Sequence, residues 1–234
     1  MSINYLFDVD GTLTNHRQKI DDDFRKMFGN WVEKQSNSGN KVFLVTGSDK
    51  QKTIQQVGTA LWRLVDGCYQ NCGNQLYRKG KLISQSSWQM SIHLRLLIID
   101  LIEKSLWYGV AGENIEERIG MVNISTVGRA CTREQRKEYY NWDVNSLERE
   151  SIVKTICLAH PELDASIGGQ ISIDIYPKGM DKAQVLDDME GETIFFGDNC
   201  EVGGNDYTVA KKADFYYNVA NPEETRHLLE TVGK

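Results

Sequence analysis

The amino-acid sequence predicts an α/β protein in which a parallel sheet with flanking helices is interrupted by an inserted α+β region. Residues 3–80 alternate apolar strand patterns with helical patterns, which is typical of parallel strands joined by crossover helices. The pattern changes over residues 81–177 and then resumes. We therefore expect a core domain made of residues 1–80 and 178–234, interrupted by an α+β cap, or lid, domain made of residues 81–177.

The first part of the core is expected to contain two strands and two helices. Each strand runs into a polar loop, and parallel sheets bind their ligands at such strand ends. The expected elements are a strand Tyr5–Asp8, a helix from about Asp21 to Gln35, a strand Lys41–Val45 and a helix from Lys50 to about Leu64.

The inserted region carries a different pattern. Its last strand, Gln170–Tyr176, alternates isoleucines with Ser172 and Asp174, which predicts a sheet with one buried and one open face. An amphipathic helix Trp88–Lys104 carries Ile92, Leu96, Ile99 and Ile102 on one stripe. The other expected elements are a strand Arg118–Ser125 and helices Thr132–Tyr140 and Asn145–Ala159.

The last part of the core resumes the alternation of the first. A final helix is predicted to begin after Asn221, with Asn221 as its cap and Pro222 at its first position. The elements before it are a helix Lys182–Asp188, a strand Thr193–Gly197 and a strand Phe215–Val219.

Composition excludes several classes of protein. Of the 234 residues, 40% are apolar and 26% are charged, as in an ordinary globular protein. No apolar stretch approaches the roughly 20 residues of a membrane span. The net charge of −6 argues against a general nucleic-acid binder. The N-terminus carries no secretory pattern and the five scattered cysteines favour reduced thiols, so we expect a cytoplasmic protein without a membrane partner.

The most informative motif is Asp8-Val9-Asp10-Gly11-Thr12, directly behind an apolar strand. Alternation places Asp8 and Asp10 on the same side of the chain, where a cation would offset their repulsion. Asp8 could then attack phosphorus as a carboxylate nucleophile, and Asp10 could carry the proton. The alternative reading of this motif alone is a strand followed by an Asp-Gly turn.

Three further motifs follow in order and favour the chemical reading. Thr46 and Ser48 follow the second strand and could hold a phosphate, while Lys182 could neutralise the phosphoryl group. Asp198 ends a later strand and precedes Gly203-Gly204-Asn205-Asp206. Taken singly, Thr46 could form a turn, Lys182 could be solvated and Asp198 could cap a helix. Together with the first motif, they resemble the haloacid dehalogenase superfamily, which implies a Rossmann-like parallel-sheet core.

Longer stretches of the sequence carry a closer resemblance than the superfamily motifs do. They are similar to the eukaryotic-type phosphomannomutases over essentially the whole chain. The chain departs from that family in having Cys72 before Gly73-Asn74-Gln75, where the family usually has an acidic residue before Asn-Gly. The matching strings are Asp8–Thr14 with Arg17–Ile20, Gly120–Ser125 with Gly128-Arg129, Gly168–Asp174, Asp181-Lys182, and Phe195–Asp198 with Gly203–Asp206.

The resemblance implies an enzyme that interconverts mannose 6-phosphate and mannose 1-phosphate and so feeds GDP-mannose synthesis. It implies an aspartyl-phosphate at Asp8, with Asp10, Thr46 and Lys182 completing the catalytic set. It further implies Mg²⁺ held by Asp8, the Asp10 carbonyl and Asp198, a hexose 1,6-bisphosphate activator, and a homodimer joined through the cap. The implied substrate contacts are Arg17, Arg118, Arg129, Arg136, Ser172 and Asp174.

Two alternatives remain open from the residues alone. One is a sugar-phosphate phosphatase of the same superfamily, in which water discharges the phosphoaspartate. The other is a non-catalytic protein that binds sugar phosphates. The cap arginines favour the mutase over the phosphatase, and the presence of both Asp8 and Asp10 argues against a silent binding protein.

Overall fold

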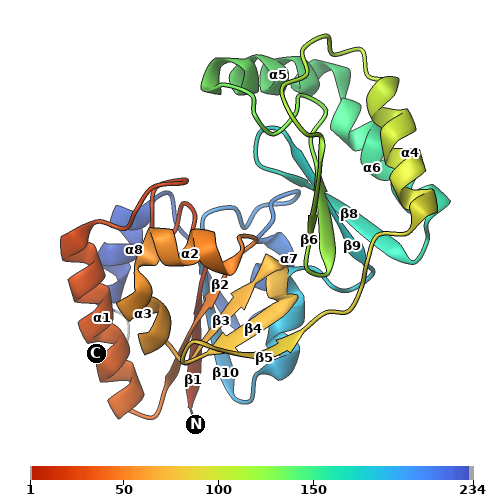
Figure 1. The fold of residues 1–234 in the computed structure, drawn as a ribbon. Coiled ribbons are helices and arrows are strands. Elements are labelled where there is room, and N and C mark those ends of the chain that lie inside the picture. Colours follow the sequence, from red (N-terminus) through yellow and green to blue (C-terminus); the bar gives the residue numbers. More distant parts are fainter. Residues whose placement is uncertain (1, 232–234) are drawn as a thin grey trace. The chain divides into compact units, whose positions relative to one another are not determined.

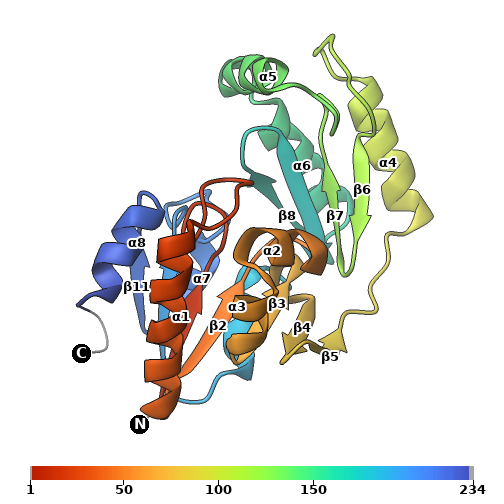
Figure 2. The ribbon, with the colours of Figure 1, turned by 60° about the vertical axis from the view of Figure 1, so that its left-hand side comes forward.

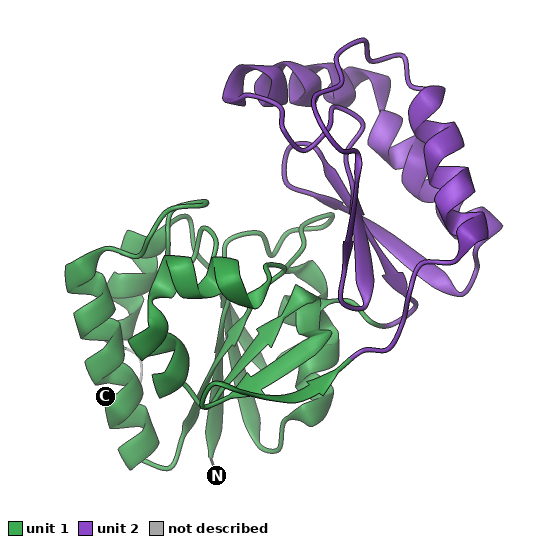
Figure 3. Ribbon diagram, viewed as in Figure 1, with its two compact units in different colours: residues 1–85, 180–234 green, residues 86–179 purple. Residues whose placement is uncertain are grey.

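A computed structural model describes residues 2–231. The chain divides into two compact units, which are coloured separately in Figure 3. The core unit comprises Met1–Gln85 and Met180–Lys234, and the cap unit comprises Ser86–Gly179. Among the described residues, no helix is both long and apolar enough to cross a bilayer.

The core unit is built on one mostly parallel sheet (Figure 1). Its first five strands in spatial order pair in parallel, and the last two continue as antiparallel strands. The strands in that order are β11 (Phe215–Asn218), β10 (Glu192–Gly197), β1 (Ile3–Phe7), β2 (Lys41–Val45), β3 (Gly67–Gln70), β4 (Gln75–Arg78) and β5 (Lys81–Gln85).

Helices cover both faces of this sheet, and strand alternation explains why. Tyr5 and Phe7 point into one apolar cluster, whereas Leu6 points into a second cluster on the opposite face. The first cluster is covered by α1 (Asp22–Asn37), α2 (Lys50–Val57), α3 (Thr59–Leu64) and α8 (Pro222–Leu229), and Figure 2 shows α1 and α3 in front of the strands. The second is covered by α7 (Tyr207–Lys212) and the 3₁₀ helix η2 (Lys182–Asp188).

The expected long helix from Lys50 to Leu64 is wrong in one respect, because it is two helices. Gly58 lies between α2 and α3 with φ of +83° and ψ of 150°. Glycine reaches positive φ without steric penalty, so the chain turns there and a second helix begins. The expected cap of the last helix is confirmed: the Asn221 side chain accepts from the Glu224 amide at 3.0 Å, with Pro222 opening α8.

The cap unit is an α+β structure built on an antiparallel sheet. In spatial order its strands are β6 (Ile115–Arg118), β7 (Met121–Ile124), β9 (Ser172–Pro177) and β8 (Leu163–Gly168). Its helices are α4 (Ile92–Glu103), α5 (Arg133–Ser146) and α6 (Glu148–Ala159), and α4 and α6 pack on the apolar face of the sheet. Ile173 and Ile175 lie in that apolar cluster, as the alternation of β9 predicts.

Three expectations about the cap are wrong. The helix expected to end at Tyr140 runs on to Ser146, so Asn145 belongs to α5 and α6 begins only at Glu148, after Leu147 adopts a left-handed φ of 54°. The single strand expected over Arg118–Ser125 is a hairpin, because Gly120 adopts a φ of +72° and lets β6 turn into β7. The expected helix Trp88–Lys104 begins only after Ser91, whose hydroxyl caps it by accepting from the Leu94 amide. Its buried face carries Leu94 and Ile98, whereas the side chains of Ile92, Leu96 and Ile99 are exposed.

Candidate active site

The first site loop turns sharply where β1 ends. The Asp8 amide donates to the Phe196 carbonyl at 2.9 Å, which continues the β1–β10 ladder by one residue. Gly11 then has a φ of +95°, and its amide donates to the Thr14 carbonyl at 2.7 Å. A Cβ at Gly11 would lie 2.1 Å from the Asp198 Oδ2, so only glycine brings the two loops this close.

Three carboxylates and one lysine meet at the ends of these strands. Oxygens of Asp8, Asp198 and Asp206 lie within 4.8 Å of one another. The Lys182 Nζ lies 2.5 Å from an oxygen of Asp8 and 2.5 Å from an oxygen of Asp206. Lys182 is 2% exposed, so its ammonium group is paired with these two carboxylates and is not solvated. Three negative groups against one positive group leave a net charge of −2 when all are ionised.

This excess of negative charge perturbs the carboxylates. Burial, reinforced by Asp206 and Asp198, outweighs Lys182 and raises the pKa of Asp8 well above its usual value. Burial and the charge of Asp206 raise the pKa of Asp198 to about 6. Carboxylate oxygens are the ligands that Mg²⁺ prefers, and a divalent cation would balance the two surplus charges. The donor set therefore fits Mg²⁺, with Asp206 as an addition to the predicted ligands.

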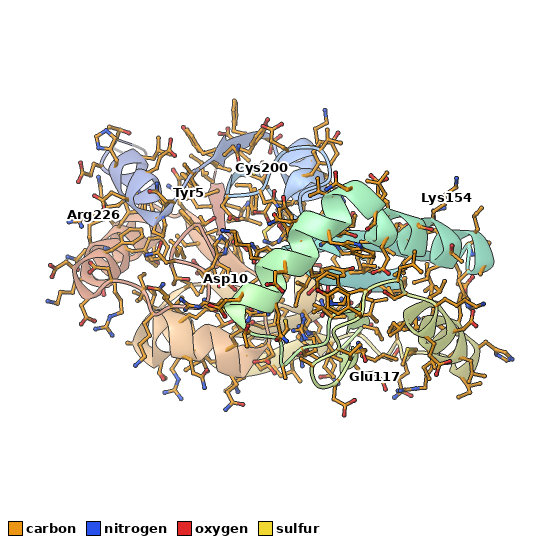
Figure 4. All side chains as sticks on the ribbon, turned by 90° about the horizontal axis from the view of Figure 1, so that it is seen from above. Tyr5, Asp10, Glu117, Lys154, Cys200 and Arg226 are labelled. Atoms are coloured by element: carbon orange, nitrogen blue, oxygen red, sulfur yellow. The ribbon has the colours of Figure 1, made fainter. Side chains whose placement is uncertain are left out.

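Asp10 occupies a separate environment beside α2 and is labelled in Figure 4. Its Oδ1 accepts from the Arg17 amide and the Gln56 Nε2, each at 2.8 Å. Its Oδ2 accepts from the Lys52 Nζ at 2.8 Å and from the Ser48 Oγ at 3.4 Å. Burial alone would raise the pKa of Asp10, but these donors, with Lys52 foremost, hold the pKa below its usual value.

Two threonine hydroxyls lie buried in the loops of the core site. The Thr46 Oγ1 accepts from the Ser48 amide at 3.1 Å, which fixes the loop after β2. Thr46 is 1% exposed and Thr12 is fully buried. Within residues 2–231, the Thr12 Oγ1 has no hydrogen-bond partner. A buried hydroxyl of this kind is able to donate to a ligand oxygen.

A second polar cluster lies in the cap unit, on strands β6, β7 and β9 and the loop after β7. The Arg129 guanidinium donates to the Asn123 Oδ1 at 2.6 Å and to the Ser172 Oγ at 3.1 Å. Asn123 in turn donates to the Asp174 Oδ1 at 2.6 Å. The strand register explains this contact, because Asn123 on β7 pairs directly with Asp174 on β9.

Glu116 joins the two cap arginines. Its carboxylate accepts from the Arg118 Nε at 2.9 Å and lies 2.6 Å from the Arg129 Nη2. Burial would raise the pKa of Glu116, but both guanidinium groups outweigh it and lower that pKa. Burial raises the pKa of Asp174 despite the same two arginines. The cap cluster thus consists of Glu116, Arg118, Asn123, Arg129, Ser172 and Asp174.

The structure groups most of the predicted site residues into two sets, one in each unit. Asp8, Thr46, Lys182 and Asp198 belong to the core set, and Arg118, Arg129, Ser172 and Asp174 to the cap set. Arg17 lies in the core loop, where its φ is 60° and its amide contacts Asp10. Arg136 lies on α5, and its role remains a prediction, as does the Asp10 carbonyl as a metal ligand.

Sequence reasoning missed several members of these sets. Lys52 and Gln56 are separated from Asp10 by 42 and 46 positions, so no local string reveals their contact. Glu116 lies in none of the matching strings, and Asn123 lies in the Gly120–Ser125 string but was not singled out as a site residue. Asp206 stood in the Gly203-Gly204-Asn205-Asp206 string, and its position after a strand-end carboxylate was a usable signal for the metal cluster.

Comparisons with known proteins point to one family. Residues 28–234 match the family model described as eukaryotic phosphomannomutase. The phosphomannomutase of Encephalitozoon cuniculi is 33% identical, with 97% of this chain and 91% of that protein aligned. Human phosphomannomutase 1 is 34% identical, with 94% of this chain and 88% of that protein aligned.

Solved structures share the fold at lower identity. The C-terminal domain of Candida albicans trehalose-6-phosphate phosphatase superposes with a TM-score of 0.65 at 15% identity, covering 97% of this chain and 90% of that one. A sugar phosphatase of haloacid dehalogenase subclass IIB gives a TM-score of 0.59 at 17% identity, covering 99% of each chain. The α/β core with an inserted α+β cap is therefore the haloacid dehalogenase fold, and the chain belongs to the eukaryotic phosphomannomutase family.

Proposed function

We propose that this chain is a phosphomannomutase that interconverts mannose 6-phosphate and mannose 1-phosphate. The observation that carries the proposal is the pair of arginines in the cap cluster, in a chain that also holds the buried Asp8–Lys182 site. A mutase must bind a phosphate that is not being transferred, and a phosphatase has less need to do so. The names of the relatives agree with this assignment.

Each of the core residues has its own role in the proposed phosphoryl transfer. With Asp8 phosphorylated, the ionised Asp10 takes the proton of a sugar hydroxyl as the phosphoryl group leaves Asp8 for that oxygen. On the second leg, an Asp8 oxygen forms the bond to the other phosphorus while that phosphorus loses its bond to the sugar oxygen, and Asp10 returns the proton to the released oxygen. Lys182 holds Asp8 in place and, with Thr46, steadies the oxygens of the moving group.

Mg²⁺ would be held by carboxylates of the core cluster and would reduce the repulsion between Asp8 and the phosphoryl oxygens. The residues that fit this role are Asp8, Asp198 and Asp206, which bring a surplus of negative charge to one point. We also propose the Asp10 carbonyl as a ligand. Removal of the cation with EDTA, followed by its return, tests this part of the proposal.

Arginine binds phosphate through two parallel hydrogen bonds, which fixes both position and direction. Arg118 and Arg129 are already aligned by Glu116, and Ser172 and Asp174 offer groups for sugar hydroxyls. We propose that this cap cluster, with Arg136 and with Arg17 of the core, binds the substrate during transfer.

Further parts of the proposal rest on the family. They are activation by a hexose 1,6-bisphosphate, a cytoplasmic location, the core and cap units as functional domains, and a homodimer formed through the cap. The exposed side chains of Ile92, Leu96 and Ile99 on α4 support the last of these, because paired copies would shield them. Sedimentation of the wild type against a Leu96→Glu variant tests it: the variant should be monomeric.

One experiment separates the mutase from its rivals. The protein is incubated with mannose 1-phosphate, Mg²⁺ and a trace of hexose 1,6-bisphosphate, and the phosphorus NMR spectrum is followed. Conversion to the 6-phosphate supports the mutase. Release of inorganic phosphate without conversion would identify a phosphatase, and an unchanged spectrum would identify a binding protein.

A further inference from the structure

The carboxylate of Asp10 is held by two separate sets of donors. One set, the Arg17 amide and the Gln56 side chain, holds Oδ1, and the other, Lys52 with Ser48, holds Oδ2. Building on the proposed role of Asp10 in proton transfer, we propose that Lys52 is a positioning residue, which orients the Asp10 carboxylate toward the oxygen that gains or loses the proton.

Lys52 is itself fixed at both ends. Its backbone amide donates to the Asp49 side chain at 2.8 Å, which is the N-cap bond of α2. Its Nζ lies 2.9 Å from the Ser48 Oγ and 2.8 Å from the Asp10 Oδ2. The capped backbone fixes where the side chain starts, and the two contacts of Nζ restrict the rotamers that a lysine side chain ordinarily samples. Among the described residues, the ammonium group thus donates to the Oδ2 of Asp10 and not to its Oδ1.

Without Lys52, the Oδ2 of Asp10 would keep only the Ser48 hydroxyl at 3.4 Å among its side-chain donors. A hydrogen bond this long is weak, so the carboxylate would rotate more freely about the axis set by Oδ1. Proton transfer needs a donor–acceptor separation within hydrogen-bond reach and the correct direction. The loss should therefore fall on the chemical step and not on the binding of the sugar phosphate.

The same helix supplies a matched control. Lys50 lies two residues earlier, and its Nζ lies 4.9 Å from the centre of the Tyr77 ring and 5.2 Å from that of Trp62. It has the same charge as Lys52 and lies on the same helix, but its ammonium packs on aromatic rings and, among the described residues, forms no hydrogen bond or ion pair with Asp10. Replacing Lys50 tests the effect of losing a positive charge from α2 alone.

The first measurement compares kcat and KM for three variants. Lys52→Met should lower kcat by roughly 10- to 100-fold, part of the 10²–10⁴-fold that general acid–base catalysis supplies, with KM within about twofold. Lys52→Arg should recover part of the lost kcat, and Lys50→Met should keep the wild-type kcat. A higher KM with an unchanged kcat would overturn the proposal. Thermal unfolding confirms that each variant folds, and Lys52→Gln replaces Lys52→Met if the latter does not.

The second measurement asks whether Lys52 acts through Asp10. In an Asp10→Asn background, Lys52→Met should lower kcat by less than about a further twofold, because the carboxylate that Lys52 positions is already absent. If the two losses multiply, Lys52 acts on the phosphoryl group directly and the proposal is overturned. Lys50→Met in the same background serves as the control.

The third measurement separates this inference from the identity of the sugar. 4-Nitrophenyl phosphate has a leaving group that needs no proton, whereas a hexose 1,6-bisphosphate has one that does. Lys52→Met should leave the nitrophenolate burst unchanged and slow transfer from the bisphosphate. That result supports the role of Lys52 even if mannose 1-phosphate is not converted. An equal slowing of both reactions would overturn it.

Discussion

Asp8 is the residue on which the proposed chemistry depends most directly. It is buried beside Lys182, and Asp8→Asn keeps the size of the side chain while removing the negative charge that attacks phosphorus. We expect no measurable turnover and a normal circular dichroism spectrum, because Lys182 retains its contact with Asp206. Activity is measured after mass spectrometry has excluded deamidation. Near-normal turnover in such a sample would remove Asp8 from the nucleophile's role.

Asp198 makes the stability of the metal-free protein depend on pH. Its pKa is raised to about 6 in the folded chain, above the roughly 3.9 of an unfolded aspartate. The folded state therefore binds more protons between these values, and this contribution to stability is lost as the pH rises from 4 to 6. We expect the free energy of unfolding of Asp198→Asn to lack this fall between pH 4 and pH 6. Urea unfolding in EDTA across this range measures the difference between the two proteins.

Magnesium supplies the control for the pH experiment. A bound cation favours the ionised carboxylate, so saturating Mg²⁺ should flatten the difference between wild type and Asp198→Asn over pH 4–6. Equal pH dependence of the two metal-free proteins would show that Asp198 is not perturbed by its neighbours.

For single residues, the sequence predicts site residues that belong to a local motif and misses those that meet only when the chain folds. Asp8, Asp10 and Asp198 each follow a recognisable strand, so their place at one sheet edge could be predicted. Lys52 could not be, because its contact depends on how α2 lies against the loop after β1. Glu116 was missed for the same reason, since its role comes from the cap arginines around it.

At the scale of elements, the corner between α5 and α6 is held by a buried ion pair. The Arg149 Nε donates to the Asp143 Oδ2 at 2.7 Å, and the Arg149 Nη1 reaches the Gly169 carbonyl at 2.9 Å. Asp143→Ala would leave a buried guanidinium unpaired, which typically costs about 3–5 kcal/mol. Hydrogen exchange at the amides of Ile152 and Ile156 on α6 measures the free energy of opening. A change below about 1 kcal/mol would be too small for an unpaired buried charge.

The matching double variant isolates the charge. Asp143→Ala with Arg149→Met removes both members of the pair, so no uncompensated charge remains in the cap. We expect it to be more stable than Asp143→Ala alone.

Periodicity predicts the strands and helices better than it predicts their interruptions. The alternation of β9 and the cap at Asn221 follow directly from side-chain chemistry. The breaks at Gly58 and Gly120 depend on positive φ values, which a glycine permits but does not require. Of the stripe predicted on α4, Ile92, Leu96 and Ile99 are exposed and only Ile102 packs on the apolar cluster, because the helix is apolar on more than one face and periodicity alone does not select the buried side.

At the scale of the whole molecule, the insertion could be predicted because the α/β alternation stops near residue 80 and resumes at η2, although β5, which was expected in the cap, pairs with β4 in the core sheet. The strand order could not be read from the pattern. β10 and β11 come last in the chain, yet β10 pairs with β1, and this pairing brings Asp198 to Asp8. The predicted chemistry requires that non-local pairing, which only the fold supplies.

The balance between mutase and phosphatase activity is the property of the molecule that the cap cluster should set. Arg129 donates to Asn123 and Ser172 and lies against Glu116, which also accepts from Arg118. Arg129→Ala would remove one of the charged contacts proposed for the distal phosphate, and a hydrogen bond to a charged group contributes about 1.5–3 kcal/mol. It would also leave Glu116 to pair with Arg118 alone, weakening the second arginine as a phosphate ligand.

We therefore expect Arg129→Ala to reduce mutase turnover more than hydrolysis of a hexose 1,6-bisphosphate, because the intermediate escapes before its second transfer and water discharges Asp8. Both activities are measured on one preparation, with Arg133→Ala as the control for losing an exposed cap arginine from the start of α5. The ratio of free phosphate to isomerised sugar phosphate should rise for Arg129→Ala and stay constant for Arg133→Ala. An equal fall in both activities of Arg129→Ala would mean that Arg129 supports general binding or cap folding, and the cap cluster would no longer explain why this chain is a mutase.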